Sequence, residues 1–255
     1  MDVNAVQTPD AASGKTHAQV TGPGSAWSRY GHVMVGKAGL GALLYYEWCT
    51  ALATVPGALG LMLRKTFWPH QFAACGAGSQ FSERIRCMHP GRIWIGARAV
   101  IADGCVLDAR CHTTERAIEL GDAAMLSHGV MLSAKNDTIR VGQHCGIGAY
   151  TVIQATAGNP VEIGDDVVIG AHCYITGGGN YHTERLDIPI ARQGLKVQGG
   201  ITIGPGVWIG AQASLLGGIT IGRDSIIGTG AVVTKSIPER SIAVGVPARV
   251  VDTRR

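Results

Sequence analysis

The feature that most constrains this chain of 255 residues is a six-residue period of aliphatic side chains between residues 93 and 235. The period is grouped in threes, so the repeating unit is 18 residues long. The aliphatic positions are Ile95, Ile101 and Leu107; Leu120, Leu126 and Leu132; Val141, Ile147 and Ile153; Ile163, Ile169 and Ile175; Ile203, Ile209 and Leu215; and Ile221, Ile227 and Val233. An internal period of this kind indicates a repeat architecture.

The residue that follows each aliphatic distinguishes the three members of a group. It is glycine after every first member and after most second members, and it is never glycine after a third member. Three unlike hexapeptides predict an all-β solenoid of triangular section, in which each side is a short strand paired with the coils above and below. We expect six coils, about 29 Å tall at roughly 4.8 Å per coil. The aliphatic side chains should point inward, and the glycines should supply the backbone conformations that tight corners demand.

The insertions in the repeat all follow a third member and therefore leave the prism at one corner. Seven extra residues follow Leu107, three follow Leu132, four follow Ile153 and 22 follow Ile175. Insertions on one edge of a repeat protein commonly mark its binding face. The 22-residue insertion, about residues 176–197, is the predicted functional loop.

Composition fits one domain with extensions. A formal charge of +4 is too small to indicate nucleic acid as a partner. Aromatic residues make up only 5% of the chain, as expected for a thin core that cannot hold large rings. The seven cysteines include no CxxC pair and no signal peptide precedes them, so we expect reduced thiols in a cytoplasmic protein. Cys105, Cys145 and Cys173 fall on inward positions and should pack in the core.

The repeat domain, residues 75–251, is expected to have extensions at both ends. Residues 1–28 are rich in Ala, Gly, Ser, Thr and Pro and predict a disordered tail, and residues 252–255 form a second short tail. Residues 29–74 contain apolar stretches with interruptions, so no span of about 20 apolar residues is present. We expect an N-terminal helical extension that caps the open end of the solenoid.

Residues 29–74 also allow a second interpretation, which is peripheral contact with a membrane. In that case Lys37, Arg64 and Lys65 would lie near lipid head groups while Trp48, Trp68 and the leucines insert. This interpretation would place the cytoplasmic protein at the inner membrane surface.

The functional loop carries a candidate general base. His182 is the only histidine of the insertion, and histidine suits proton abstraction because its ordinary pKa is near 6.5. Polar neighbours that could orient it or bind a polar substrate are Asn180, Tyr181, Glu184, Arg185 and Asp187. His112, His128 and His144 occupy unlike positions in the repeat, so we expect no convergent metal site.

Three motifs in the last coils carry a resemblance to a known family. They are "VWIG" at 207–210, "GTGAVVTKSIP" at 228–238 and "VGVPARVV" at 244–251. With the preceding coils they resemble the hexapeptide-repeat acyltransferases of the left-handed parallel β-helix fold over about residues 90–251. The segment "PGALGLMLRKTFWP" at 56–69 is similar to the helical leader of acyltransferases found with bacterial exopolysaccharide genes.

The resemblance implies an acetyl-CoA-dependent O-acetyltransferase acting on a hydroxyl of a sugar or polysaccharide precursor. It implies a homotrimer with the active site between neighbouring prisms, a loop histidine (here His182) as general base, and no metal. Acetyl-CoA would lie along a groove of the C-terminal coils. The positions that match the family's donor-binding residues are Ala211, Thr229, Thr234, Lys235 and Arg249.

The chain departs from the family pattern at three points. A second basic residue often found three after Arg249 is Asp252 here, and polysaccharide-type relatives often place the loop histidine where this chain has Tyr181. An asparagine from the coil before the loop is not evident near Ile153. The alternative functions are N-acetylation of an amino-sugar nucleotide and a non-catalytic β-helix scaffold, and the alternative base is His172.

Overall fold

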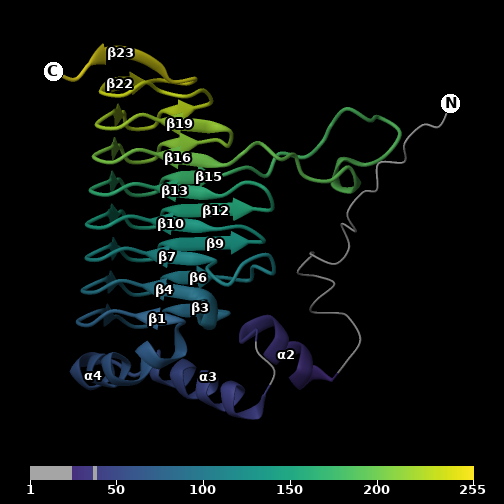
Figure 1. Cartoon of the computed structure of the whole chain (residues 1–255), viewed down its shortest axis with the longest axis vertical. Helices are drawn as coiled ribbons and strands as arrows, with labels where there is room; N and C mark the ends of the chain where they lie inside the picture. The colour runs from purple at the N-terminus through teal and green to yellow at the C-terminus, as the bar shows by residue number, and fades with distance from the viewer. Residues whose placement is uncertain (1–24, 37–38) are drawn as a thin grey trace.

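The computed structural model describes residues 25–36 and 39–255, which form a parallel β-solenoid with helices at its N-terminal end (Figure 1). Three sheets make the sides of the prism. Sheet A contains β1 (Ala74–Cys75), β4 (Ile93–Ile95), β7 (Ile118–Leu120), β10 (Ile139–Val141), β13 (Val161–Ile163), β16 (Ile201–Ile203) and β19 (Ile219–Ile221). Sheet B contains β2 (Gln80–Phe81), β5 (Val100–Ile101), β8 (Met125–Leu126), β11 (Gly146–Ile147), β14 (Val168–Ile169), β17 (Trp208–Ile209), β20 (Ile226–Ile227), β22 (Ser241–Val244) and the antiparallel β23 (Arg249–Thr253). Sheet C contains β3 (Arg86–Met88), β6 (Val106–Asp108), β9 (Met131–Lys135), β12 (Val152–Thr156), β15 (Tyr174–Thr176), β18 (Ser214–Leu215) and β21 (Val232–Val233).

The solenoid is longer than the six coils expected, because a coil precedes Ile93 and part of another follows β21. The first coil, β1 to β3, places Cys75, Phe81 and Cys87 at the inward positions, six residues apart. The period was therefore present there, carried by two cysteines and a phenylalanine in place of aliphatic residues. At the other end, Ile237 bridges to β19 and β22 pairs with β20.

The inward positions form one apolar core along the prism. All eighteen aliphatic side chains of the repeat are at most 4% exposed. Cys105, Cys145 and Cys173 are buried among them, as predicted, and burial raises the pKa of the Cys105 thiol to about 11. Their burial makes these cysteines core residues. A thiol that stays protonated is also a poor nucleophile.

The corner glycines have a different role from the one expected. Gly121 does not adopt a positive φ; instead, a Cβ at this position would lie 2.6 Å from the backbone nitrogen of Gln143 in the next coil. The left-handed conformation falls two residues later, at Ala123 (φ 55°) and likewise at His144 (φ 55°). The glycines that directly follow an aliphatic residue therefore provide space for stacking one coil on the next. The left-handed conformation falls at the third residue after the aliphatic, which is glycine in some coils, as at Gly104 and Gly206, and another residue in others.

The N-terminal helices are α2 (Ala26–Met34), α3 (Leu40–Leu52) and α4 (Gly57–Phe67), with the 3₁₀ helix η1 (Trp68–Gln71) leading into the first coil. Further 3₁₀ helices are η2 (Pro90–Arg92) and η3 (Ile190–Arg192). Residues 1–24, most of the predicted tail 1–28, lie outside the described residues, as does Lys37, and α2 begins inside that predicted tail. At the C-terminus, β23 extends into the predicted tail 252–255.

The helices close the end of the solenoid at its first coil (Figure 1). The rings of Trp68 and Phe72 pack on Phe81, the inward residue of β2. The guanidinium of Arg64, whose side chain is buried, donates hydrogen bonds to the backbone carbonyls of Leu52 (2.9 Å) and Phe81 (3.0 Å). Among the described helices, none is long and apolar enough to span a membrane.

The insertions leave at one corner, as predicted. The long connections all run from sheet C to sheet A, and the longest joins β15 to β16. Figure 1 shows this connection projecting far from the side of the prism, beyond the shorter loops of the same edge.

Candidate functional site

The functional loop is folded back on itself as a short ribbon. Tyr181 forms an antiparallel bridge with Leu195, and the N–H of His182 donates to the carbonyl of Gly194 (3.0 Å). The backbone of His182 is thus held by the returning arm, while its side chain remains half exposed to solvent.

His182 lies at the end of a chain of polar contacts. Its Nδ1 is 3.3 Å from Oε2 of Glu184, and Oε1 of Glu184 is 2.6 Å from Nζ of Lys196. The hydrogen bond from Lys196 is the main cause that lowers the pKa of Glu184 to about 2. An ionised carboxylate beside Nδ1 favours the tautomer protonated on Nδ1, which makes Nε2 the proton acceptor. The arrangement is that of a general base with an orienting partner.

A pocket of about 310 Å³ lies under the base of the loop. Among the described residues, those that line it are all uncharged, and they include Gln154, Thr156, Tyr174, Thr176, Asn180 and Tyr181. Amide and hydroxyl groups both donate and accept hydrogen bonds, as sugar hydroxyls do. The pocket therefore suits a neutral polar molecule.

Two of the four predicted substrate residues contribute to this pocket, and two do not. Asn180 and Tyr181 line it, and the side-chain amide of Asn180 donates to Gln198 (3.1 Å). Arg185 and Asp187 instead form an ion pair with each other, which raises the pKa of Arg185 and lowers that of Asp187. The charges of Arg185 and Asp187 therefore neutralise each other within the loop.

Asn159 anchors the loop to the preceding insertion and was not predicted from the sequence. Its side chain is fully buried. Its amide donates to the carbonyl of Lys196 (3.1 Å), and its side-chain oxygen accepts from the N–H of Gln198 (2.6 Å). The returning arm that carries Lys196 is therefore fixed by a residue six positions after Ile153, in the coil before the loop.

The predicted donor residues border sheet C in the last coils. Ala211 and Thr229 occupy the corner between sheets B and C in adjacent coils, where the N–H of Gly230 donates to the carbonyl of Ala211 (2.9 Å). A Cβ at Gly210 would lie 2.5 Å from the nitrogen of Thr229, so only glycine permits this close stacking. The structure brings these two predicted residues together at one corner.

Of the remaining donor residues, Thr234 and Lys235 lie at the opposite edge of sheet C, whereas Arg249 pairs with Val244 of β22 and lies at the corner between sheets B and C. Thr234 and Lys235 follow β21 directly, and Arg249 follows Ala248, whose N–H donates to the carbonyl of Val232 (2.8 Å). Within the described part of the chain, neither Lys235 nor Arg249 takes part in an ion pair, and both are exposed. Two cations without carboxylate partners fit the phosphate groups of coenzyme A.

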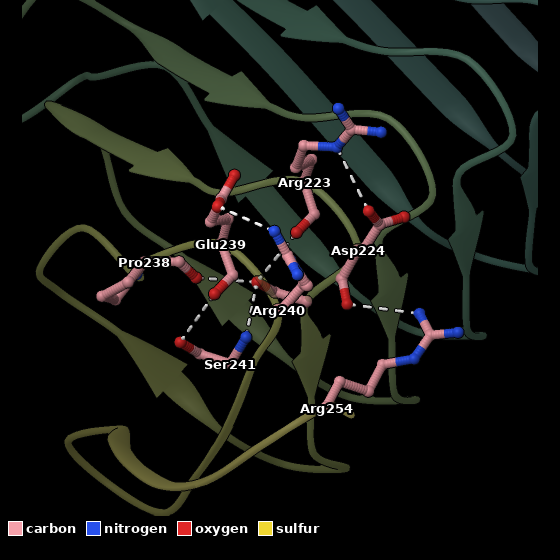
Figure 2. Close-up of polar contacts among 8 residues, drawn as sticks. Arg223, Asp224, Pro238, Glu239, Arg240, Ser241 and Arg254 are labelled. Atoms are coloured by element: carbon pink, nitrogen blue, oxygen red, sulfur yellow. Dashed lines mark hydrogen bonds and ion pairs between the residues drawn. The ribbon is translucent and has the colours of Figure 1, made fainter.

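Other basic residues of the C-terminal coils already have partners. Figure 2 shows Arg223 against Asp224 (3.1 Å) and Arg240 against Glu239 (3.3 Å). Arg254 donates to the backbone carbonyl of Asp224 (3.2 Å). Arg223 and Arg240 pair with the carboxylate next to them in sequence, so these residues are weaker candidates for phosphate binding.

His172, the alternative base, lies away from the loop. Its ring stacks on Tyr150 at a centroid distance of 5.3 Å, and Tyr150 contacts His128 at 4.9 Å, so the three rings form a ladder along the corner between sheets B and C. Over the described ranges, no group of three or more His, Cys, Asp or Glu side chains could hold a metal ion.

Two segments of the chain match known repeat families. Residues 138–177 match the hexapeptide repeat of succinyl-transferase, and residues 200–235 match the bacterial transferase hexapeptide. The solenoid is a left-handed β-helix of hexapeptide repeats. In fold it is similar to the N-acyltransferase AntD from Bacillus cereus, solved with dTDP and 3-hydroxybutyryl-CoA, with a TM-score of 0.50, 22% identity and coverage of 72% of this chain and 84% of that one. It is also similar to LpxA from Acinetobacter baumannii, with a TM-score of 0.52, 16% identity and coverage of 70% and 62%.

Curated relatives match part of the chain. A probable acetyltransferase of Mycobacterium tuberculosis is 36% identical over 138 residues, which is 54% of this chain and 45% of the relative. The galactoside O-acetyltransferase of Escherichia coli is 41% identical over 93 residues, covering 36% of this chain and 43% of that protein. The chain spans about half the length of the curated relatives it matches.

Proposed function

We propose that this chain is an acyltransferase that moves the acetyl group of acetyl-CoA to a hydroxyl of a sugar or polysaccharide precursor. The observation that carries the proposal is the contact chain from His182 through Glu184 to Lys196 on the longest insertion. The acetyltransferase relatives support the reaction class. We further propose a cytoplasmic homotrimer of the exopolysaccharide type, with its active site between neighbouring prisms.

The proposed reaction is a direct transfer. Nε2 of His182 takes the proton of the acceptor hydroxyl as the hydroxyl oxygen attacks the thioester carbonyl carbon. The tetrahedral intermediate then collapses, the C–S bond breaks, and the thiolate of coenzyme A leaves and receives the proton from His182. Glu184 stabilises the imidazolium, and Lys196 holds Glu184 in place. Lys235 and Arg249 bind the phosphates of the donor.

The test is steady-state kinetics with acetyl-CoA and a panel of glycan acceptors. His182→Ala should lower kcat by about 10² or more, and Glu184→Gln should lower it by about 10-fold, while acetyl-CoA affinity stays unchanged in both variants. Arg192→Gln, an exposed change in the same loop, is the matched control. Retained activity in His182→Ala with activity lost in His172→Ala would move the base to His172. Failure of the wild-type protein to bind acetyl-CoA would favour the scaffold.

N-acetylation of an amino-sugar nucleotide is the second candidate, because the fold is similar to that of an N-acyltransferase solved with dTDP. The uncharged pocket under the loop favours a neutral acceptor, since a nucleotide diphosphate needs cationic partners. Parallel assays with an amino-sugar nucleotide and a neutral glycan separate the two reactions.

A further inference from the structure

The helices at the end of the solenoid present large apolar side chains to solvent. Leu40 (72% exposed), Leu44 (61%) and Trp48 (48%) come from α3, and Leu59 (63%) and Met62 (67%) come from α4. We call these five side chains the basal face. Helices α3 and α4 contact each other and lie across the end of the prism below the first coil (Figure 1). At their ends, the ring of Trp48 packs edge-on against Phe67 of α4.

Helix α3 is apolar on both of its sides. The exposed residues Leu40, Leu44 and Trp48 recur every four positions and therefore share one side of the helix. The buried residues Tyr46, Cys49 and Leu52 face the solenoid on the other side. A helix that only capped the solenoid would place polar side chains outward. A group of exposed apolar residues on neighbouring helices marks an interaction surface.

The charges around the basal face identify the kind of partner. Between residues 25 and 72 the only acidic residue is Glu47, whose carboxylate accepts a hydrogen bond from the Tyr30 hydroxyl (2.6 Å). Lys65 is exposed on α4, three residues after Met62, and the guanidinium of Arg64 is committed to backbone carbonyls. Leucine, methionine and tryptophan beside lysine, with almost no acidic residue, are typical of helices that lie in a membrane interface.

We propose that the basal face binds the surface of an anionic lipid bilayer. Helices α3 and α4 lie in the plane of the interface, with the five apolar side chains in the acyl boundary and Lys65 at the lipid phosphates. The binding is peripheral. It is independent of the proposed function, because the predicted donor residues and the functional loop belong to coils further along the prism.

The test is co-sedimentation of the full chain with phosphatidylcholine vesicles, with and without 30% phosphatidylglycerol (about that fraction suffices for an anionic surface). The wild-type protein should bind the anionic vesicles and release at high salt. Leu44→Glu and Met62→Glu should each weaken binding by about 10-fold or more. Val251→Glu, at a residue 61% exposed on the opposite end of the prism, is the matched control and should bind like the wild type.

Three results would overturn the proposal. The first is no binding of the wild-type protein to anionic vesicles. The second is an equal loss of binding in Val251→Glu. The third is a concentration-dependent assembly without vesicles that Leu44→Glu abolishes, since the basal face would then be a contact between proteins. Unchanged acetyl-CoA affinity in Leu44→Glu and Met62→Glu would show that these variants are folded. A loss of vesicle binding could then be distinguished from a failure of the proposed transferase function.

Discussion

Acidification should weaken the contact between α2 and the solenoid through His89. The side chain of His89 is 3% exposed, and its Nε2 lies 2.9 Å from the carbonyl oxygen of His32. The backbone N–H of His89 donates to the carbonyl of Met34 (2.8 Å). Within the described residues, Nδ1 has no hydrogen-bond partner. A proton added to Nδ1 would therefore be buried without an acceptor.

The magnitude follows from the two pKa values of His89. Burial is the main cause that lowers its pKa from 6.5 to about 4 in the folded protein. Arg92 and His112 lower it further, whereas the hydrogen bond with the His32 carbonyl and the charge of Asp108 raise it. Above pH 6.5 the His89 ring is neutral in both the folded and the unfolded protein, so it does not change the free energy of unfolding. As the pH falls below 6.5 the unfolded state binds a proton that the folded state does not, so stability is lost until the pH reaches about 4. The full loss is about 3 kcal/mol, of which about 2 kcal/mol is reached by pH 5.

Urea unfolding followed by tryptophan fluorescence between pH 7.5 and pH 5.0 (a window of about 2.5 units that spans most of the expected loss) measures this effect. His89→Asn suits the left-handed backbone at this position (φ 52°) and removes the titrating ring. The variant should be less stable at pH 7.5 but should lose about 2 kcal/mol less than the wild type on acidification. The exposed His70→Asn should keep the wild-type profile. Parallel profiles for the wild type and His89→Asn would refute the reasoning.

Two further predictions concern the solenoid. Gly121→Ala should destabilise the protein by about 1–3 kcal/mol, because the new Cβ would meet the next coil at 2.6 Å, whereas Gly146→Ala meets nothing within 4 Å; equal melting temperatures for the two variants would contradict this account of the corner glycines. Leu132→Ala, at a residue 0% exposed, should cost about 2–5 kcal/mol, and Val168→Ala, at a residue 52% exposed, should change stability by less than about 0.5 kcal/mol. Calorimetry checks both pairs, and similar losses for the second pair would disprove the assignment of inward positions.

The sequence by itself determined the solenoid, because each coil repeats the same local requirement. An inward side chain every six residues is enough to define a strand, its face and its neighbours, so Leu132 could be placed in the core without knowledge of distant residues. The corner that carries the insertions followed from the same count. The first coil was missed because Cys75, Phe81 and Cys87 keep the spacing but not the aliphatic side chains. The positions of the corner glycines were readable, but their purpose was not, because it depends on the distance between stacked coils.

Only the tertiary structure decided how the loop is organised. Glu184 and Lys196 are separated by eleven residues in which the only regular element is the short helix η3, and they meet because the loop returns on itself as a ribbon. Asn159 reaches the loop from another coil, 39 residues before Gln198. Contacts between irregular segments depend on the path of the backbone, which leaves no period in the sequence. The repeat allows the solenoid to be predicted from the sequence. The loop has no repeat, and this is the physical reason that the environment of His182 could not be predicted.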